Sequence, residues 1–242
     1  MATLLRMPDN LIDLVVTSPP YDNLRNYERF SMNLKVIVPL LYKKVTDGGV
    51  VVWVGGDSTR NGSESGNSFR QALLFMSCGF NLHDTMIYAK NNYIPLTHNR
   101  YEQCWEYMFV FSKGKPKTFN PKMIDCLTGG ITANWTHKGY CTTIKEGACR
   151  RRDENITTKQ TKIAPNIFYY SLGALYAGHP APFPDKLAED HILSWSEPTD
   201  IVYDPFAGSG TTLKMAKKHH RLFIGSEIAV KYKPIIDKRL DF

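Results

Sequence analysis

Cysteine is scarce in this chain of 242 residues. Its five cysteines are odd in number and form no Cys-x-x-Cys pair, so we expect reduced thiols rather than a disulfide framework or a zinc site. Cys126, His137, Cys141 and Cys149 could in principle gather around a metal ion, but their spacing is not typical of a ligand set. We therefore predict no metal site.

Long hydrophobic runs are also lacking. No window approaches the roughly 18 apolar residues of a membrane span, and residues 1–8 lack the apolar core of a signal peptide. We expect a cytoplasmic protein with no membrane partner. With 43% hydrophobic and 22% charged residues the composition is that of a globular protein, and the length fits one large domain or a core with an insertion.

The positive charge is concentrated in one segment. Residues 113–162 hold eleven Lys and Arg against four acidic residues, a local excess that equals the net charge of +7 of the whole chain. A neutral body with one basic segment indicates a polyanionic partner that meets a single face. The alternative is a solvated loop without a partner, because charge runs often mean only that.

Strand and helix patterns alternate along the chain, which predicts a layered α/β fold. The expected strands are 11–16, 50–54, 84–88, 107–111, 200–203 and 221–224, and the expected helices are 31–45, 68–79, 187–196 and 211–219. From residue 113 to about 176 the periodicity fades and Gly, Thr, Asn and Lys predominate. This stretch is the candidate insertion.

Two short motifs follow expected strands. The first, Asp204-Pro-Phe-Ala-Gly-Ser-Gly-Thr-Thr212, joins a strand to a helix, and we call it the glycine corner. Its glycines permit a tight turn and let helix amides face a ligand. Glu227 stands where a carboxylate can accept both hydroxyls of a ribose. No Gly-Lys-Ser/Thr follows, so the motif indicates a nucleoside without phosphates rather than a nucleoside triphosphate.

The second motif, Thr17-Ser-Pro-Pro-Tyr21, ends the first strand, and we call it the proline corner. Two prolines fix the backbone, so the Ser18 hydroxyl and the Pro19 carbonyl can be held as a pair of acceptors. An exocyclic amine has two hydrogens to offer such a pair. Tyr21 adds an aromatic face for a base removed from a duplex. Taken alone, the segment also fits an ordinary strand stopped by prolines.

The two motifs together resemble the amino-methylating DNA methyltransferases in their permuted order, where the catalytic half precedes the S-adenosylmethionine-binding half. Residues 48–57 and 106–114 resemble two further strands of that family. Residues 179–184 resemble its segment that closes over the methionine end of the cofactor. The resemblance implies a Rossmann-like, mostly parallel sheet with helices on both faces and an irregular target-recognition insertion.

Roles carry over by this resemblance, residue by residue. It implies a catalytic half at 1–112, a target-recognition insertion at 113–175 and a cofactor-binding half at 176–242. The catalytic residues would be Ser18, Pro19, Pro20 and Tyr21. The residues that bind S-adenosylmethionine, and its product S-adenosylhomocysteine, would be His179, Pro180, Phe183, Asp204, Phe206, Ala207, Gly208, Ser209, Gly210, Thr211 and Glu227. Those that contact double-stranded DNA would be Lys113, Lys115, Lys117, Arg150, Arg151 and Arg152.

The target base follows from chemistry only in part. Methylation of cytosine carbon 5 needs a thiolate, usually from Pro-Cys, and no cysteine here follows a proline. Family members with Ser in the first motif position mostly resemble cytosine-N4 enzymes, so we favour cytosine N4 and keep adenine N6 as the alternative. A non-catalytic binding protein, an RNA methyltransferase and a dinucleotide-dependent oxidoreductase explain the two motifs less completely.

The resemblance also predicts partners and one departure. A second copy of the chain and a companion restriction endonuclease are candidate partners, in a bacterial, archaeal or phage-infected cell. Family members in this order begin with a strand ending in Gly-Asp, whereas this sequence starts at the following helix. We therefore expect the strand at 221–224 to be a sheet edge, with either weaker cofactor affinity or a strand from a partner.

Overall fold

The computed structural model describes residues 2–20, 33–93, 99–134, 155–171 and 184–241. These residues form two compact units, a core of residues 1–120 and 165–242 and a smaller unit of residues 121–164. No helix within these ranges is long and apolar enough to cross a membrane.

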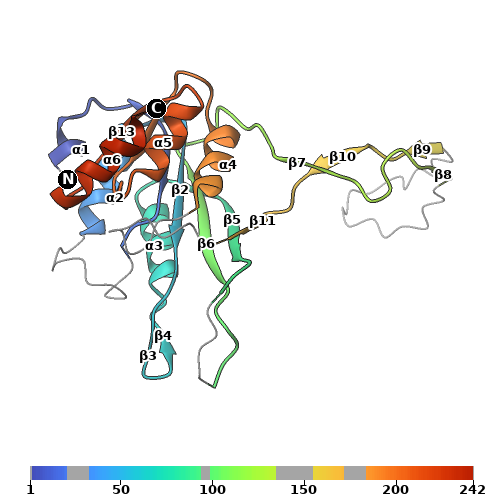
Figure 1. Ribbon diagram of the computed structural model, residues 1–242, viewed down its shortest axis with the longest axis horizontal. Coiled ribbons are helices and arrows are strands. Elements are labelled where there is room, and N and C mark those ends of the chain that lie inside the picture. Colours follow the sequence, from blue (N-terminus) through green and yellow to red (C-terminus); the bar gives the residue numbers. More distant parts are fainter. Residues whose placement is uncertain (1, 21–32, 94–98, 135–154, 172–183, 242) are drawn as a thin grey trace. The chain divides into compact units, whose positions relative to one another are not determined.

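The core is built on a seven-stranded sheet with the order β11-β5-β6-β2-β1-β12-β13 (Figure 1). The strands are β1 (Ile12–Thr17), β2 (Val45–Gly55), β5 (Asn81–Lys90), β6 (Trp105–Ser112), β11 (Ile167–Tyr170), β12 (Ile201–Asp204) and β13 (Leu222–Gly225). Only β6 runs antiparallel to its neighbours β2 and β5, and every other adjacent pair is parallel. The expected mostly parallel sheet is confirmed.

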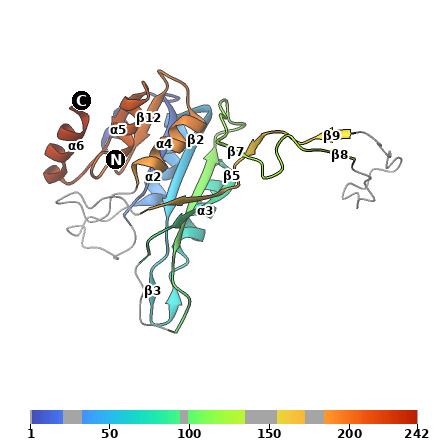
Figure 2. The ribbon, with the colours of Figure 1, turned by 45° about the vertical axis from the view of Figure 1, so that its right-hand side comes forward.

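Helices cover both faces of this sheet (Figures 1 and 2). On one face α1 (Ala2–Arg6), α2 (Leu34–Lys44) and α3 (Asn67–Ser77) enclose a cluster centred on Trp53, Phe75 and Phe111. On the other, α4 (Asp185–Trp195) and α5 (Thr211–Lys218) enclose the branched residues of β1 and β2. A 3-10 turn, η1 (Val230–Tyr232), leads into α6 (Lys233–Leu240), which packs against α5.

The expected elements are present, with shifted ends and two omissions. The strand expected at 50–54 already begins at Val45, because the Asp47-Gly-Gly49 turn lies inside β2, where the register with β1 shifts. Two elements had no predicted counterpart. Helix α6 is one, and β11 is the other: it lies within 113–175 but pairs with β5 in the core sheet. Its sequence, Ile-Phe-Tyr-Tyr, is half exposed and lacks a long aliphatic run.

Strand β13 is the outermost strand of the sheet as described, which agrees with the edge expected at 221–224. Between β2 and α3 a small hairpin of β3 (Thr59–Arg60) and β4 (Ser63–Glu64) extends from the sheet. It follows directly from the end of β2 (Figure 1).

The unit of residues 121–164 contains two short antiparallel pairs. Strand β7 (Met123–Asp125) pairs with β10 (Thr161–Ile163), and β8 (Thr132–Asn134) pairs with β9 (Asn155–Thr157). Each strand is three residues long, and the residues of β10 are all exposed. Backbone hydrogen bonds rather than a buried apolar cluster hold the described part of this unit together.

Candidate active site

The carboxyl ends of β1 and β12 meet at one edge of the sheet, which we call the carboxyl edge. The two strands are parallel neighbours in which Val15 pairs with Tyr203. Just beyond this pair the buried Thr17 hydroxyl donates a 2.6 Å hydrogen bond to Asp204 Oδ1. Thr212 Oγ1 donates to the Val16 carbonyl at 3.0 Å. The proline corner and the glycine corner therefore lie side by side, as the sequence predicts.

The proline corner presents its acceptors from a firmly held strand end. Thr17 and Pro19 are buried, whereas Ser18 and Pro20 are partly exposed. Tyr21 lies outside the described residues. Because β1 is hydrogen-bonded on both sides, by β2 and β12, the backbone that carries Ser18 has little freedom to move.

The glycine corner has the backbone conformation that glycine permits. Gly208 and Gly210 have φ angles of 50° and 81°, in the left-handed region. A Cβ at Gly210 would come within 3.3 Å of Ile236, so close packing adds to the requirement. Glu227 accepts the Gly208 amide at 2.7 Å and the Ala229 amide at 2.8 Å, one at each carboxylate oxygen. Glu227 is therefore fixed against the loop that opens α5.

Asp204 is the carboxylate at the centre of this junction. Burial raises the pKa of Asp204 to about 6, although hydrogen bonds from Thr17 and the Phe206 amide favour its charged form. Among the described residues Asp204 Oδ2, which is buried, has no hydrogen-bond partner. A buried carboxylate oxygen without a donor is costly, and a cationic or hydrogen-bonding ligand would stabilise it.

Sequence reasoning missed an arginine that braces the glycine corner. Arg239 of α6 is 9% exposed, and its Nη1 donates to the Ser209 hydroxyl at 2.9 Å and to Thr211 Oγ1 at 3.1 Å. Its Nη2 forms a 2.6 Å ion pair with Asp185, the first residue of α4. One side chain thus ties α6, the glycine corner and α4 together. No local pattern reveals it, because Arg239 is one of three basic residues in a short polar helix.

Aromatic side chains also reach the carboxyl edge, from the beginning of β6. Gly55 at the end of β2 pairs with Tyr107. The Tyr107 ring lies 4.8 Å from Trp105 and 5.5 Å from the exposed Phe69 of α3, measured between ring centroids. An antiparallel strand contributes its first residues to this edge, where a parallel strand would contribute its last.

The sequence as a whole matches one family model, described as DNA methylase of the N6/N4 type, over residues 12–238. The chain belongs to this DNA methylase family. An orphan methyltransferase of Bacillus amyloliquefaciens, M.BamHII, is 48% identical over 96% of the methylase and 89% of its own length. M.BglII of Bacillus subtilis, a type II methyltransferase, is 26% identical over 96% of the methylase and 64% of its own length.

Solved structures share the fold of the methylase. The PvuII DNA methyltransferase, described as cytosine-N4-specific, superposes with a TM-score of 0.69 at 22% identity and covers 98% of this chain and 82% of its own. A DNA modification methylase of Thermus thermophilus, TTHA0409, solved with S-adenosyl-L-methionine, has a TM-score of 0.64 at 23% identity, covering 99% and 90%. At these identities the likeness establishes the architecture.

Two of the expected DNA contacts lie at the opposite edge of the methylase sheet. Lys117 Nζ contacts Asp13 at 2.6 Å and Asp200 at 3.5 Å, both at the beginnings of strands. Burial favours the neutral amine, but these carboxylates outweigh it and raise the pKa of Lys117. Lys113 bonds Asn10 Oδ1 at 2.7 Å and pairs with Asp47 at 3.3 Å. The two lysines are thus compensated locally, and the structure does not bring them to the carboxyl edge.

The other expected site residues divide into two groups. Lys115 is exposed next to Lys117. His179, Pro180, Phe183, Arg150, Arg151 and Arg152 lie outside the described residues, as do His137, Cys141 and Cys149. Within the described ranges no three His, Cys, Asp or Glu side chains are grouped as metal ligands.

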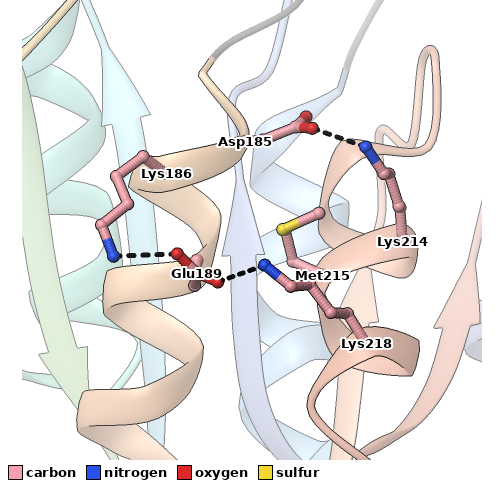
Figure 3. Close-up of a pocket in the computed structure, with 6 residues that line it drawn as sticks. All are labelled: Asp185, Lys186, Glu189, Lys214, Met215 and Lys218. Carbon is pink, nitrogen blue, oxygen red and sulfur yellow. Dashed lines mark hydrogen bonds and ion pairs between the residues drawn. The ribbon is translucent and has the colours of Figure 1, made fainter.

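A shallow hollow between α4 and α5 is the clearest pocket of the described core, yet none of the predicted site residues lines it (Figure 3). It is bordered by Asp185, Lys186, Glu189, Lys214, Met215 and Lys218. Glu189 accepts from Lys186 and Lys218 at 2.8 Å each and from His219 at 2.7 Å. The lysines lower the pKa of Glu189 to about 2. These charges are paired with one another, so the hollow is a helix-to-helix ion-pair network.

Proposed function

We propose that this DNA methylase transfers a methyl group from S-adenosylmethionine to the exocyclic amine of a flipped cytosine, at N4. The observation that carries the proposal is the Thr17–Asp204 hydrogen bond, which joins the end of β1 to the end of β12. It places the paired acceptors Ser18 and Pro19 next to the glycine corner. A methyl donor and an amine could therefore share one cavity.

The residues of the glycine corner fit the cofactor. Each Glu227 oxygen accepts one backbone amide and keeps a further lone pair, so the carboxylate can also accept ribose hydroxyls. The unpartnered Asp204 Oδ2 offers negative charge to a cationic molecule. S-Adenosylmethionine, when bound, supplies an electrophilic methyl group on a positively charged sulfur. The solved complex of TTHA0409 with S-adenosyl-L-methionine supports the same choice.

The proline corner supplies the catalytic groups. The lone pair of an aromatic amine is delocalised into the ring and attacks poorly. If Ser18 Oγ and the Pro19 carbonyl accept its two hydrogens, the nitrogen becomes pyramidal and the lone pair localises. The positive charge that develops only in the transition state is then stabilised. Firm placement of the amine contributes further, because near-attack geometry can supply about 7–11 kcal/mol.

Cytosine N4 is favoured over adenine N6 by two observations. Ser18 occupies the first position of the proline corner, and the PvuII enzyme that shares the fold is described as cytosine-N4-specific. Chemistry alone permits adenine, since both amines present the same two hydrogens to Ser18 and Pro19.

Mass spectrometry of nucleosides tests the proposal. Plasmid DNA from a host without methyltransferases is incubated with the protein and S-adenosylmethionine, then digested to nucleosides. N4-methylcytosine is the expected product. N6-methyladenine alone would overturn the choice of base, and S-adenosylmethionine binding without any methylated nucleoside would overturn the activity.

A further inference from the structure

The β3–β4 hairpin is an unexplained projection of the core. It connects β2 to α3 and continues past the carboxyl edge, beyond Gly55 (Figures 1 and 2). Thr17 pairs with Trp53, so β2 already extends past the proline corner before the hairpin begins. The hairpin therefore lies on the side of the sheet where the proposed reaction occurs.

The tip of the hairpin is a tight two-residue turn. Asn61 and Gly62 have φ angles of 49° and 77°, and Arg60 pairs with Ser63 across the turn. This is the turn that suits the right-handed twist of a two-stranded ribbon. All six residues from 59 to 64 are polar or glycine, and all are exposed. A surface without apolar side chains is a poor protein-docking site, because a protein interface needs an apolar centre.

The base of the hairpin is rigidly held. Asp57 Oδ1 accepts the Ser65 hydroxyl at 2.7 Å and the Ser68 amide at 3.2 Å. Burial would raise the pKa of Asp57, but these hydrogen bonds outweigh it and lower the pKa. Arg100, from the β5–β6 connection, donates to the Gly62 carbonyl at 2.7 Å and lies 3.9 Å from Glu64. A ribbon fixed at its base and near its tip loses little entropy when it binds.

Arg60 remains available to a partner. It is exposed, and no hydrogen bond or ion pair joins its side chain to another described residue. Glu64, the other charged residue of the two strands, is near Arg100. A two-stranded polar ribbon fits the major groove of DNA, where arginine recognises guanine and asparagine recognises adenine.

We propose that the β3–β4 hairpin is a second DNA-contacting element, which meets the duplex beside the flipped base through Arg60 and Asn61. The inference rests on the proposed function and adds a contact from the catalytic core to those expected from residues 113–175. It assigns part of the DNA affinity to the core itself.

The test compares DNA binding by three variants of the full chain. Arg60→Ala and Arg60→Glu change the hairpin, and Arg6→Ala replaces an exposed arginine of α1, which precedes the beginning of β1. Affinity for a 30-bp duplex is measured by fluorescence anisotropy at several salt concentrations. Thermal melting and S-adenosylmethionine affinity verify that each variant is folded.

Arg60→Ala should weaken DNA binding about three- to tenfold and reduce the slope of log affinity against log salt by about 1, the value for one lost phosphate contact. A relaxed methylation sequence at one flanking position would equally support the hairpin, because it indicates a base contact. Arg60→Glu should weaken binding further, and Arg6→Ala should match the wild type.

Wild-type affinity and slope in both folded Arg60 variants would overturn the hairpin inference and leave the proposed function intact. A wild-type protein that binds S-adenosylmethionine but not DNA would overturn both.

Discussion

The core sheet and the unit of residues 121–164 are held together in different ways. Strands β1 and β2 are buried over most of their length between two layers of helices, whereas β7 and β10 are three residues long and mostly exposed. Buried apolar strands fix position to a fraction of an ångström, as chemistry at the carboxyl edge requires. Short exposed strands fix little. This contrast suggests that the core carries the reaction and that the smaller unit contributes mainly to the choice of DNA.

The largest expected effect is at the proline corner. Ser18→Ala removes one of the two proposed acceptors of the amine and should lower kcat about 10²- to 10³-fold. Affinity for DNA and for S-adenosylmethionine should stay within about twofold, because the acceptor acts in the transition state. Single-turnover methylation measures the effect. Ser77→Ala, an exposed serine at the end of α3, is the matched control. Undiminished turnover in Ser18→Ala would remove this residue from the reaction.

Asp204 should make cofactor affinity depend on pH. Its pKa of about 6 means that the free protein carries this carboxylate charged above pH 6 and protonated below. If the charged form binds the cofactor, affinity falls about tenfold for each pH unit below 6. Asp204→Asn should bind about 10-fold more weakly at pH 8 and show no such dependence. Calorimetric titration from pH 5 to 8 measures both, and equal profiles would contradict the assignment.

The basic segment should affect DNA binding and leave the core unchanged. Changing Arg150, Arg151 and Arg152 together to Ala should weaken DNA binding about tenfold and reduce the salt slope by about 3, if each arginine meets one phosphate. The melting temperature and S-adenosylmethionine affinity should not change. Lys113→Ala is an informative comparison, because its contacts with Asn10 and Asp47 predict lower stability rather than a smaller salt slope. An unchanged slope in the triple variant would place the DNA surface elsewhere.

The smallest effect is expected in the ion-pair network between α4 and α5. Glu189 has a pKa of about 2, below its ordinary value of 4.5, so it stabilises the folded state above pH 4.5 and loses this contribution as pH falls toward 2. The partly exposed lysines around it are screened by water, and Glu189→Gln should cost about 1 kcal/mol at pH 7. Urea unfolding at pH 7 and pH 3 measures the loss. Asp125→Asn, exposed in the 121–164 unit, should cost nothing; equal losses would erase the contrast between the two units.

Sequence predicted the elements whose signal is local. The β-branched runs at 11–16 and 50–54 identify β1 and β2, and prolines or glycines mark their ends. It also predicted that the two corners would meet, because the carboxyl ends of parallel strands share an edge. Contacts between distant residues gave no such signal. The Arg239–Asp185 pair joins residues 54 apart, and Lys117 reaches Asp13 across 104 residues. Both are charged residues in polar surroundings, indistinguishable in sequence from solvated ones.

The reversed direction of β6 has a consequence for how such enzymes diversify. Because β6 begins where β2 ends, the connection that precedes it and the hairpin that follows β2 project together from the reacting side, each anchored in buried strands. Insertions and deletions there leave the sheet intact. New sequence preferences could thus evolve in these two connections without rebuilding the chemistry that they surround.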